Sequence, residues 1–394
     1  MKPLDGIRVV DLSRVLAGPY ASLLLADMGA EVIKVEEPGK GDDTRAWPPF
    51  AGGEATYFMS VNRGKKSLTL DLKAEGGKRI LRQLLEGADV LLENFRPGTL
   101  ARLGFGHEAV RAWSPRLVYC SISGFGESGP EASRPGYDLI VQGESGLMDL
   151  TGFPDGPPVK VGNSIADLCA GTMAAHGIVL ALFARERTGV GQKVEIAMLE
   201  VMAALLTYQG QAYFATGKSP KRRGNQHPSI VPYEVFEAAD GYLTVGVANN
   251  SLWSRFCQAL ERPDLTQDPR FDAEAKRVAQ RDVLVPLLAA EFRKRPVGEW
   301  VDRLGRAGVP AGKIKSVGEA LESDHLQARG AIVSVVHPTA GPMRMVGPPI
   351  RLHDTPPAPA GPAPLLGEHS EEILGKLLGY SAEEIARLRA EGVT

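Results

Sequence analysis

Residues 7–36 read IRVVDLSRVLAGPYASLLLADMGAEVIKVE, and this stretch decides the class of fold. Two short apolar runs, Ile7–Asp11 and Glu31–Glu36, lie on either side of a helical pattern at Tyr20–Met28. Continuous runs rich in Val and Ile are typical of parallel strands that are buried on both faces, and a helix usually connects two such strands. The stretch therefore predicts a strand–helix–strand unit.

The same alternation continues as far as residue 215. Further strand-like runs occur at 67–72, 88–94, 117–123 and within 189–198. Helical patterns separate or follow them, at 75–86, from Asp167 onward, and at Leu199–Ala215. Repetition of this unit predicts an α/β fold, with a Rossmann-like, mostly parallel sheet that helices cover on both faces.

The character of the sequence changes at residues 217–232, GKSPKRRGNQHPSIVP, which are basic and loop-like. Strand-like runs and then helical stretches follow, and they predict a smaller α+β domain inserted at 225–325. Strand character returns in AIVSVVHP at 331–338, before the linker TPPAPAGPAP and amphipathic helical turns. We therefore expect a large domain at 1–224, the insertion, and a linker and return to the large domain at 326–394. The role of the loop at 218–232 stays open.

Composition excludes several classes of protein. The chain has 394 residues and a formal net charge of -2, so no overall field favours nucleic acid or an anionic membrane. Its three cysteines are far apart and match no metal-binding spacing, which is typical of reduced thiols. The N-terminus has no apolar signal region, and we find no uncharged run long enough to span a membrane. We expect a cytoplasmic enzyme.

The first predicted turn lacks the fingerprint of a dinucleotide site. Glu36 stands where a ribose-binding acid would lie, but the turn has only Gly18 in place of G-x-G-x-x-G. A nicotinamide or flavin site is therefore not favoured. SRVLAGP still follows a parallel strand, where such sheets bind ligands, and Pro19 is expected at the first helical position.

Two further loops carry cationic and amide side chains. ENFRPGTLARLG at 93–104 offers Asn94, Arg96 and Arg102 as an anion cradle, although an ordinary surface loop is equally compatible with it. The lysines of NRGKKSLTLDLK at 62–73 are more simply explained as a solvated run of charge.

Other familiar centres are missing. The seven histidines show no metal-binding spacing, so no metal site is expected, and His176 is interpreted as a core residue. The absence of G-x-S-x-G gives no support to a serine hydrolase.

Asp167 stands alone at the start of the apolar stretch NSIADLCAGTMAAHG, residues 163–177. Asp is a favoured helix N-cap, and that interpretation needs no further function. The alternative is a covalent nucleophile, because the small residues around Asp167 leave room for a ligand. In either case we expect the exposed amides of the helix start to hold the carboxylate ionised. The local sequence favours the cap.

Several motifs in order resemble the class III coenzyme A transferases, which include formyl-CoA, carnitine-CoA and succinyl-CoA dependent members and the related 2-methylacyl-CoA racemases. They include PLDGIRVVDLSRVLAGP, GDDTR, NRGKKSLTLDLK, ENFRPGTLARLG, GYDLIVQGESGLMDLTG, ADLCAGTMAAHGI and APLLGEHSEEIL. The resemblance implies a Rossmann-like large domain that binds CoA and carries the catalytic residue, a small inserted domain, and an interlocked homodimer.

The resemblance also implies site residues. Asp167 matches the family's catalytic aspartate, which attacks an acyl-CoA thioester and forms a mixed anhydride. No cofactor is then bound permanently; the acyl-CoA thioester and a carboxylic acid are substrates, and the two acids meet near Asp167 and Tyr137. The positions that match CoA contacts are Val15, Leu16, Ala17, Leu70, Lys73, Asn94, Phe95 and Arg102, with Arg96 close to them.

Two departures from the family pattern bear on specificity. The racemases need a histidine where this chain has Tyr137, and a phenol is a poor base near neutral pH. A racemase is therefore the second hypothesis, and a non-catalytic CoA-binding protein is the third. The glycine-run loop of formyl-CoA transferases is replaced by RRGNQHPSIVPYEVF, which argues against formyl or oxalate specificity. Donor and acceptor stay open; succinyl-CoA with a dicarboxylate or short branched acid is one expectation from the family.

Overall fold

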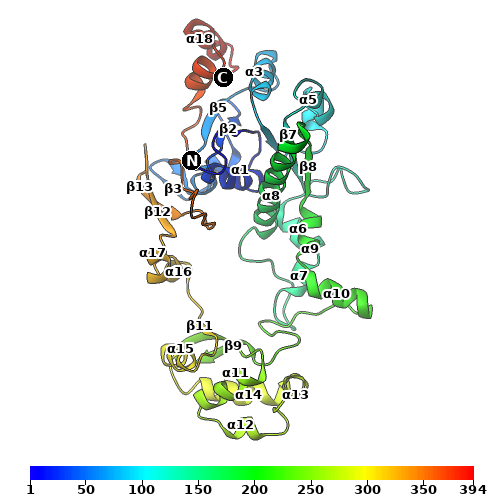
Figure 1. The fold of residues 1–394 in the computed structure, drawn as a ribbon, viewed down its shortest axis with the longest axis vertical. Coiled ribbons are helices and arrows are strands. Elements are labelled where there is room, and N and C mark those ends of the chain that lie inside the picture. Colours follow the sequence, from blue (N-terminus) through cyan, green and yellow to red (C-terminus); the bar gives the residue numbers. More distant parts are fainter. The chain divides into compact units, whose positions relative to one another are not determined.

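The computed structural model describes residues 1–394, which form two compact units (Figure 1). Unit 1 contains Met1–Leu147, Lys160–Thr216 and His325–Thr394, and unit 2 contains Met148–Val159 and Gly217–Asp324. Unit 2 thus begins before residue 225 and also takes in a short segment from before the Asp167 helix. That segment is held there because Arg222 forms an ion pair with Asp149 at 3.0 Å.

Unit 1 is built on a six-stranded sheet with the order β5-β2-β1-β6-β7-β8, in which every pairing is parallel. The predicted parallel α/β sheet is confirmed. The six strands are β1 (Arg8–Asp11), β2 (Glu31–Glu36), β5 (Lys66–Thr69), β6 (Val90–Glu93), β7 (Val118–Ser123) and β8 (Lys193–Ala197).

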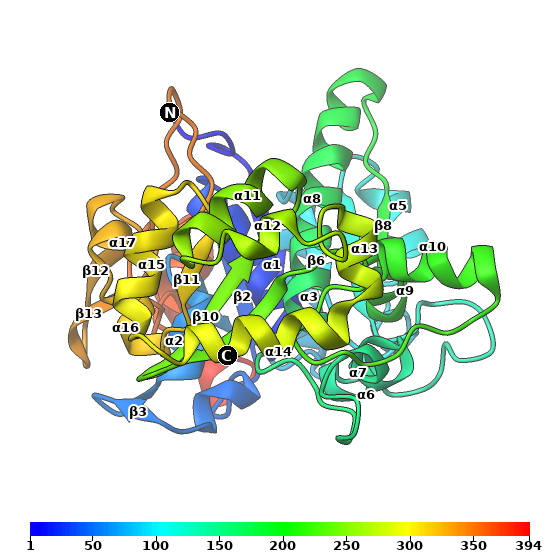
Figure 2. The same cartoon turned by 90° about the horizontal axis from the view of Figure 1, so that it is seen from below.

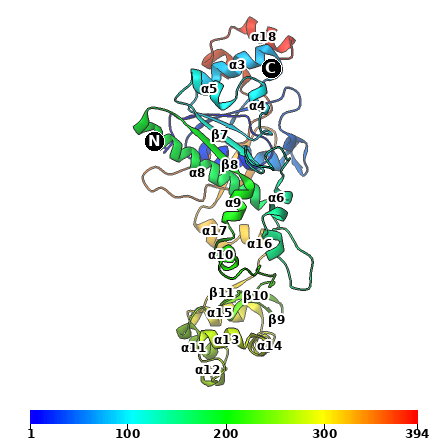
Figure 3. The same ribbon diagram turned by 90° about the vertical axis from the view of Figure 1, so that its right-hand side faces the viewer.

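Alternate residues of the buried strands fill two hydrophobic cores, one on each face of the sheet. Val9 belongs to the core beneath α1 (Ala17–Asp27) and α8 (Ile165–Thr188). The neighbouring Val10 belongs to the core shared with α3 (Glu75–Glu86) and α5 (His107–Trp113). Figure 3 shows α8 on one side of the sheet and α3, α5 and α18 (Ala382–Ala390) on the other. Burial on both faces explains why the strands read as uninterrupted apolar runs.

The remaining elements of unit 1 surround this sheet. The C-terminal segment belongs to the second core, to which it contributes Ile373, Leu374 and Leu388. The other elements are η1 (Asp43–Ala46), β3 (Phe50–Ala51), β4 (Glu54–Ala55), α2 (Thr56–Asn62), α4 (Thr99–Arg102), α6 (Asp138–Glu144), α9 (Met198–Ala204), α10 (Thr207–Thr216), α17 (Asp324–Ala328), β12 (Ile332–His337), β13 (Gly341–Val346) and the π-helix η2 (Glu372–Leu377).

Two helix predictions were wrong in detail. The single helix expected at Leu199–Ala215 is two helices, and Thr207 at the break has a positive φ of 36°. α1 begins at Ala17, so Pro19 is its third residue rather than its first. Pro is tolerated there because the amides of the first turn have no partner within the helix.

Unit 2 is organised around the antiparallel sheet β11-β10-β9 (Figure 2). Its core is aromatic: Phe236 and Phe292 stack at 4.6 Å between ring centroids, and Trp300 meets Phe292 edge-on at 5.1 Å. The elements are β9 (Tyr233–Ala238), β10 (Gly241–Gly246), α11 (Asn250–Ala259), α12 (Asp264–Gln267), α13 (Glu274–Ala279), α14 (Arg281–Phe292), α15 (Val297–Arg306), β11 (Ala311–Lys313) and α16 (Val317–Leu321); α7 (Leu147–Leu150) lies at the boundary.

Helix α8 is apolar on more than one side. By length and composition alone it could cross a membrane, but one face, with Ala170, Ala174 and Ile178, is buried in the core of unit 1. Its outer face exposes Leu180 and Phe183 together with His176. The interpretation of His176 as a core residue was therefore wrong, because His176 lies on the face of α8 opposite to the one that packs on the core.

Gly171 sets how closely α8 packs against α1. A Cβ atom at this position would lie 2.5 Å from the carbonyl oxygen of Ala17, much closer than atoms normally approach. The backbones are in direct contact there, and no side chain fits between them.

We expect Gly171→Ala to lower the free energy of unfolding by about 1–3 kcal/mol, because α1 and α8 must separate to admit the methyl group. Gly210→Ala in α10 is the matched control, since its Cβ would meet only Leu206 Cβ at 3.5 Å. The control should be neutral or up to about 1 kcal/mol more stable. Urea unfolding of both variants measures the difference; equal stabilities would contradict the close contact.

Candidate active site

Two cavities open at the carboxyl edge of the parallel sheet, at the point where the strand order reverses. β1 has β2 on one side and β6 on the other, so the loops that follow β1 and β6 diverge there. Open parallel sheets bind ligands in such crevices. Arg14 and Phe95, one from each loop, line both cavities.

The residues singled out in the sequence gather around these cavities. The first cavity is lined by Val15, Leu16, Ala17, Asn94, Tyr137 and Asp167, together with Arg96. The second is lined by Leu70, Lys73 and Arg102. Every expected CoA contact therefore lies at one cavity or the other.

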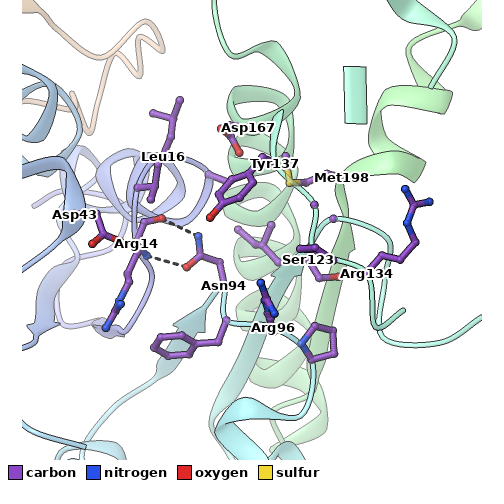
Figure 4. A pocket seen from close by; sticks show the side chains of 18 residues that line it. Arg14, Leu16, Asp43, Asn94, Arg96, Ser123, Arg134, Tyr137, Asp167 and Met198 are labelled. Carbon is purple, nitrogen blue, oxygen red and sulfur yellow. Dashed lines mark hydrogen bonds between the residues drawn. The ribbon is translucent and has the colours of Figure 1, made fainter. Parts of the chain in front are cut away.

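The turn after β1 is held in an unusual conformation. Val15 has a φ of +68°, a region that β-branched residues rarely adopt. Its backbone N–H donates to the two carboxylate oxygens of Asp42, at 3.3 and 3.2 Å. On the other side, the amide group of Asn94 forms two hydrogen bonds of 2.8 Å with the backbone of Arg14 (Figure 4). The turn is therefore clamped between two loops.

Two buried lysines stabilise the same turn from beneath. Lys34 Nζ lies 2.9 Å from Asp42 and donates to the Ser13 carbonyl at 2.8 Å. Lys65 Nζ lies 3.3 Å from Asp11, the last residue of β1. Both lysine side chains are almost fully buried, so the prediction of a solvated charge run was wrong for Lys65.

The pKa values of these groups reflect burial and mutual pairing. Burial opposes the charge on Asp42, yet Lys34 and the Thr44 amide lower its pKa to about 2. Burial lowers the pKa of Lys65 to about 8, although the Asp11 charge opposes this. A carboxylate that stays ionised can keep accepting the Val15 amide, which maintains the strained turn.

Asp167 is the third residue of α8, and Ser164 occupies the N-cap position. The interpretation of Asp167 as the helix cap was therefore wrong. Its carboxylate forms no hydrogen bond or ion pair within the chain, and it lines the first cavity (Figure 4). Small neighbours such as Ala166 and Ala170 are buried against the core, which leaves the carboxylate as the group that faces the cavity.

Asp138, which sequence reasoning missed, takes the place expected for Asp167. Its carboxylate oxygen Oδ1 accepts the backbone N–H of Ala166 at 2.8 Å and that of Asp167 at 3.4 Å. The expectation that these amides hold Asp167 ionised was wrong. Burial, and then the neighbouring Asp138 charge, raise the pKa of Asp167 to about 7. The only sequence signal was an Asp at the start of a helix, which is common in any protein.

Two tyrosines lie near this carboxylate. Tyr137 precedes α6, is 72% exposed and lines the cavity. Burial and the negative charge of Asp167 raise the pKa of Tyr57, on α2, to about 12, so this phenol stays protonated. Tyr57 was not found from the sequence. A protonated phenol close to a carboxylate can donate a hydrogen bond to it or to a bound acid.

Cationic groups occupy other parts of the cavities. Arg96 lines the first cavity, and its guanidinium forms no hydrogen bond or ion pair with the rest of the chain. Lys73 and Arg102 lie at the second cavity, where both are exposed. The first cavity thus combines the Asp167 carboxylate with the Arg96 guanidinium. The second presents the ammonium group of Lys73 and the guanidinium of Arg102, which suit carboxylates and phosphates. The chain contains no group of three or more His, Cys, Asp and Glu that could hold a metal ion.

Comparison with known proteins gives consistent matches over the chain. The sequence model of CoA-transferase family III matches residues 4–370. The succinyl-CoA:glutarate CoA-transferase of Mus musculus is 41% identical over 100% of this chain and 90% of its own length. The acetyl-CoA:oxalate CoA-transferase of Acetobacter aceti is 43% identical over 91% of this chain and 92% of its own length. A crystal structure of a CAIB/BAIF family protein from Brucella suis matches with a TM-score of 0.86 and 40% identity, covering 95% of this chain and 99% of that one.

The raised pKa of Asp167 has a consequence for stability. An acid whose pKa is raised by folding stabilises the folded state when it is protonated, and this contribution is lost as pH rises through about 7. We expect Asp167→Asn to raise the free energy of unfolding more at pH 8 than at pH 5, by about 1–3 kcal/mol. Urea unfolding at both pH values measures this. Glu391→Gln, at an exposed position, should show no such difference, and a pH-independent effect of Asp167→Asn would contradict the raised pKa.

Proposed function

Because this chain belongs to CoA-transferase family III, and is an acyl-CoA:carboxylate CoA-transferase, we propose that Asp167 is its nucleophile and that the two cavities bind the acyl-CoA. The observation that carries the proposal is the unpaired Asp167 carboxylate at the first cavity, with its pKa raised to about 7. A more basic carboxylate is a better nucleophile, and at neutral pH a large fraction of it is ionised.

The reaction divides into steps that conserve every atom. The Asp167 carboxylate attacks the thioester carbonyl carbon, a C–O bond forms, the C–S bond breaks, and CoA leaves as the thiolate. The thiolate then attacks the aspartyl carbonyl of the mixed anhydride and releases the donor acid, which leaves an aspartyl-CoA thioester. The acceptor carboxylate attacks the carbonyl carbon of this thioester, the C–S bond breaks, and CoA thiolate leaves, which gives a second anhydride. The thiolate then attacks the carbonyl carbon of the acceptor's acyl group, and the C–O bond to Asp167 breaks. New acyl-CoA leaves and the Asp167 carboxylate is restored.

The CoA portion would extend from the first cavity into the second. The turn Val15–Ala17 offers backbone groups in the same cavity as Asp167 and Asn94, and Phe95 lies where the two cavities adjoin. Lys73 and Arg102 suit the phosphates of the nucleotide. Arg14 and Phe95 line both cavities, which supports one ligand spanning them. In this assignment, unit 1 carries CoA binding and catalysis.

We assign the acceptor to the dicarboxylic acids and take succinyl-CoA as the first donor to test. The relatives named above use glutarate and oxalate, and Arg96 offers an unpaired guanidinium for a second carboxylate. Since the oxalate-using relative is 43% identical and the glutarate-using relative 41%, identity does not separate these two acids. The missing glycine run is therefore a weak argument against oxalate.

The alternatives have less support. A 2-methylacyl-CoA racemase would need a base at Tyr137, where the chain has a phenol. It would exchange solvent deuterium into the α-position without any acceptor acid. A non-catalytic CoA-binding protein would form no adduct at Asp167, so the test below separates it from an enzyme.

The quaternary structure and location are part of the same proposal. The outer face of α8 exposes Met173, Leu180 and Phe183, which suits burial in a homodimer. Interlocking of two chains, and a cytoplasmic location, are carried over from the family and from cysteine usage. Sedimentation of the purified protein tests the dimer.

We expect the protein to form a covalent adduct at Asp167 when it is mixed with succinyl-CoA. Hydroxylamine should trap it as a hydroxamate on the peptide that contains Asp167, because both an anhydride and a thioester react with this nucleophile. Mass spectrometry identifies the peptide. Asp167→Asn should form no adduct and lose transfer activity by at least about 1000-fold. Asp155→Asn, which changes an exposed carboxylate that lines neither cavity, should behave as wild type. Full turnover by Asp167→Asn would refute the mechanism.

A further inference from the structure

Asp138 connects three parts of the fold behind the cavity. It is the first residue of α6 and is only 9% exposed. Its Oδ1 atom accepts the amides of Ala166 and Asp167 in the first turn of α8. Its Oδ2 atom accepts Gln142 Nε2 at 2.7 Å, and Gln142 Oε1 in turn accepts the amide of Val161 at 3.0 Å. Each partner of Asp138 is a donor, which is what an ionised carboxylate requires.

This arrangement determines what the start of α8 can bind. The first amides of a helix have no partner within the helix and attract anions. Here Asp138 uses the amides of Ala166 and Asp167, so these groups are not free to bind the Asp167 carboxylate. Asp138 does not itself line either cavity. It lies behind the nucleophile and does not contact the space where a substrate would bind.

We propose that Asp138 is a positioning residue for the nucleophile, whose carboxylate occupies the first-turn amides of α8 and so keeps the Asp167 carboxylate unpaired, basic and directed into the cavity. The inference rests on the proposed function of Asp167. When Asp167 attacks the thioester its charge disappears into the ester-like anhydride, and its repulsion by Asp138 ends. The pair of carboxylates therefore favours acylation over the free, ionised enzyme.

Other charged groups near Asp167 do not replace this effect. α2 presents Tyr57 and α1 presents Tyr20, both of which are neutral when protonated, and α9 contributes only Met198 to the cavity. Cys169 is the nearby titratable group on α8 itself. The remaining charged or titratable cavity residues, none of which forms an ion pair with Asp167, are Arg14, Asp43, Arg96, Arg134 and Tyr137. Burial and Asp138 are what raise the pKa of Asp167.

The test is the pH dependence of acylation in Asp138→Asn. In the wild type, the rate of adduct formation with succinyl-CoA should rise with pH through about 7, as Asp167 ionises. We call this rising part of the pH–rate profile the limb. In Asp138→Asn the limb should move down by about one to two pH units, and the rate of adduct formation at pH 8 should fall by about 3- to 10-fold. KM for the acyl-CoA should change by less than about twofold, because Asp138 does not line the cavities. Glu391→Gln removes an exposed charge that lines neither cavity and should leave the limb in place.

A second variant covers the case in which Asp138→Asn does not fold. In Asp138→Asn with Gln142→Glu, the asparagine can donate to the new glutamate, which can still accept the Val161 amide, so the hydrogen bonds are kept. The negative charge moves one helical turn along α6, and the limb should lie between those of the wild type and Asp138→Asn. A limb that stays at the wild-type position in a folded variant overturns the inference, as does a wild-type limb near pH 4.

Failure of the inference and failure of the proposed function give different results. NMR titration of the aspartate carboxyl carbons reports the ionisation of Asp167 without any turnover, and Asp167→Asn identifies its signal. A shifted titration in Asp138→Asn without any acyl adduct in the wild type would show that Asp138 controls the ionisation of Asp167 but would refute Asp167 as the nucleophile. An adduct with an unmoved titration would do the reverse.

Discussion

The direct contact between the backbones of α1 and α8 is the constraint on which the rest of the site depends. Gly171 permits it, because any side chain there would collide with the Ala17 carbonyl oxygen. Residues four apart in a helix share one face, so the contact that brings Gly171 to Ala17 also brings Asp167 to the same turn. Apolar burial alone would hold α8 on the sheet at many distances. The absence of a side chain sets the distance at which a carboxylate on one helix faces a cavity lined by the turn before the other.

The turn itself needs a second kind of stabilisation. A Val with positive φ costs on the order of 1–3 kcal/mol of backbone strain. Hydrophobic packing is not directional, so it cannot by itself hold the backbone in that conformation. The Asp42 carboxylate accepts the Val15 amide, and the fully buried Lys34 keeps Asp42 charged. Breaking such a pair leaves an unpaired buried charge, which costs about 3–5 kcal/mol and so exceeds the strain that the pair maintains. The buried ion pair of Lys34 and Asp42 therefore lies directly beneath the turn at Val15, where the backbone departs from regular geometry.

The sequence predicted the sheet well, because Ile7–Asp11, Glu31–Glu36 and their successors are apolar on both faces and leave few other arrangements. The family resemblance, rather than the local sequence, led to Asp167 as a nucleophile and to Val15 and Asn94 as CoA contacts. Sequence reasoning failed where the environment comes from distant residues. Lys65 looks like a surface lysine until Asp11 is placed beside it, and His176 looks buried until the sheet is seen to lie on the opposite side of α8. Asp138 gave no distinctive signal, because the amides of α8 that it accepts lie 28 and 29 positions away.

The two carboxylates at the start of α8 show why such distant contacts decide chemistry. The first-turn amides can stabilise an anion, and two aspartates lie within reach of them. If Asp167 bound them it would be a stable cap, strongly ionised and weakly nucleophilic. Asp138 binds them instead, with Gln142 completing its hydrogen bonds, and Asp167 is left with burial and a like charge as its surroundings. The same residue type in the same helical turn can thus be either a structural cap or a basic carboxylate of the kind proposed here as the nucleophile, depending on which side chain occupies the amides. In this fold Asp138, on α6, occupies the amides. It does not line the cavity, so the residues that line the cavity can change without disturbing this arrangement.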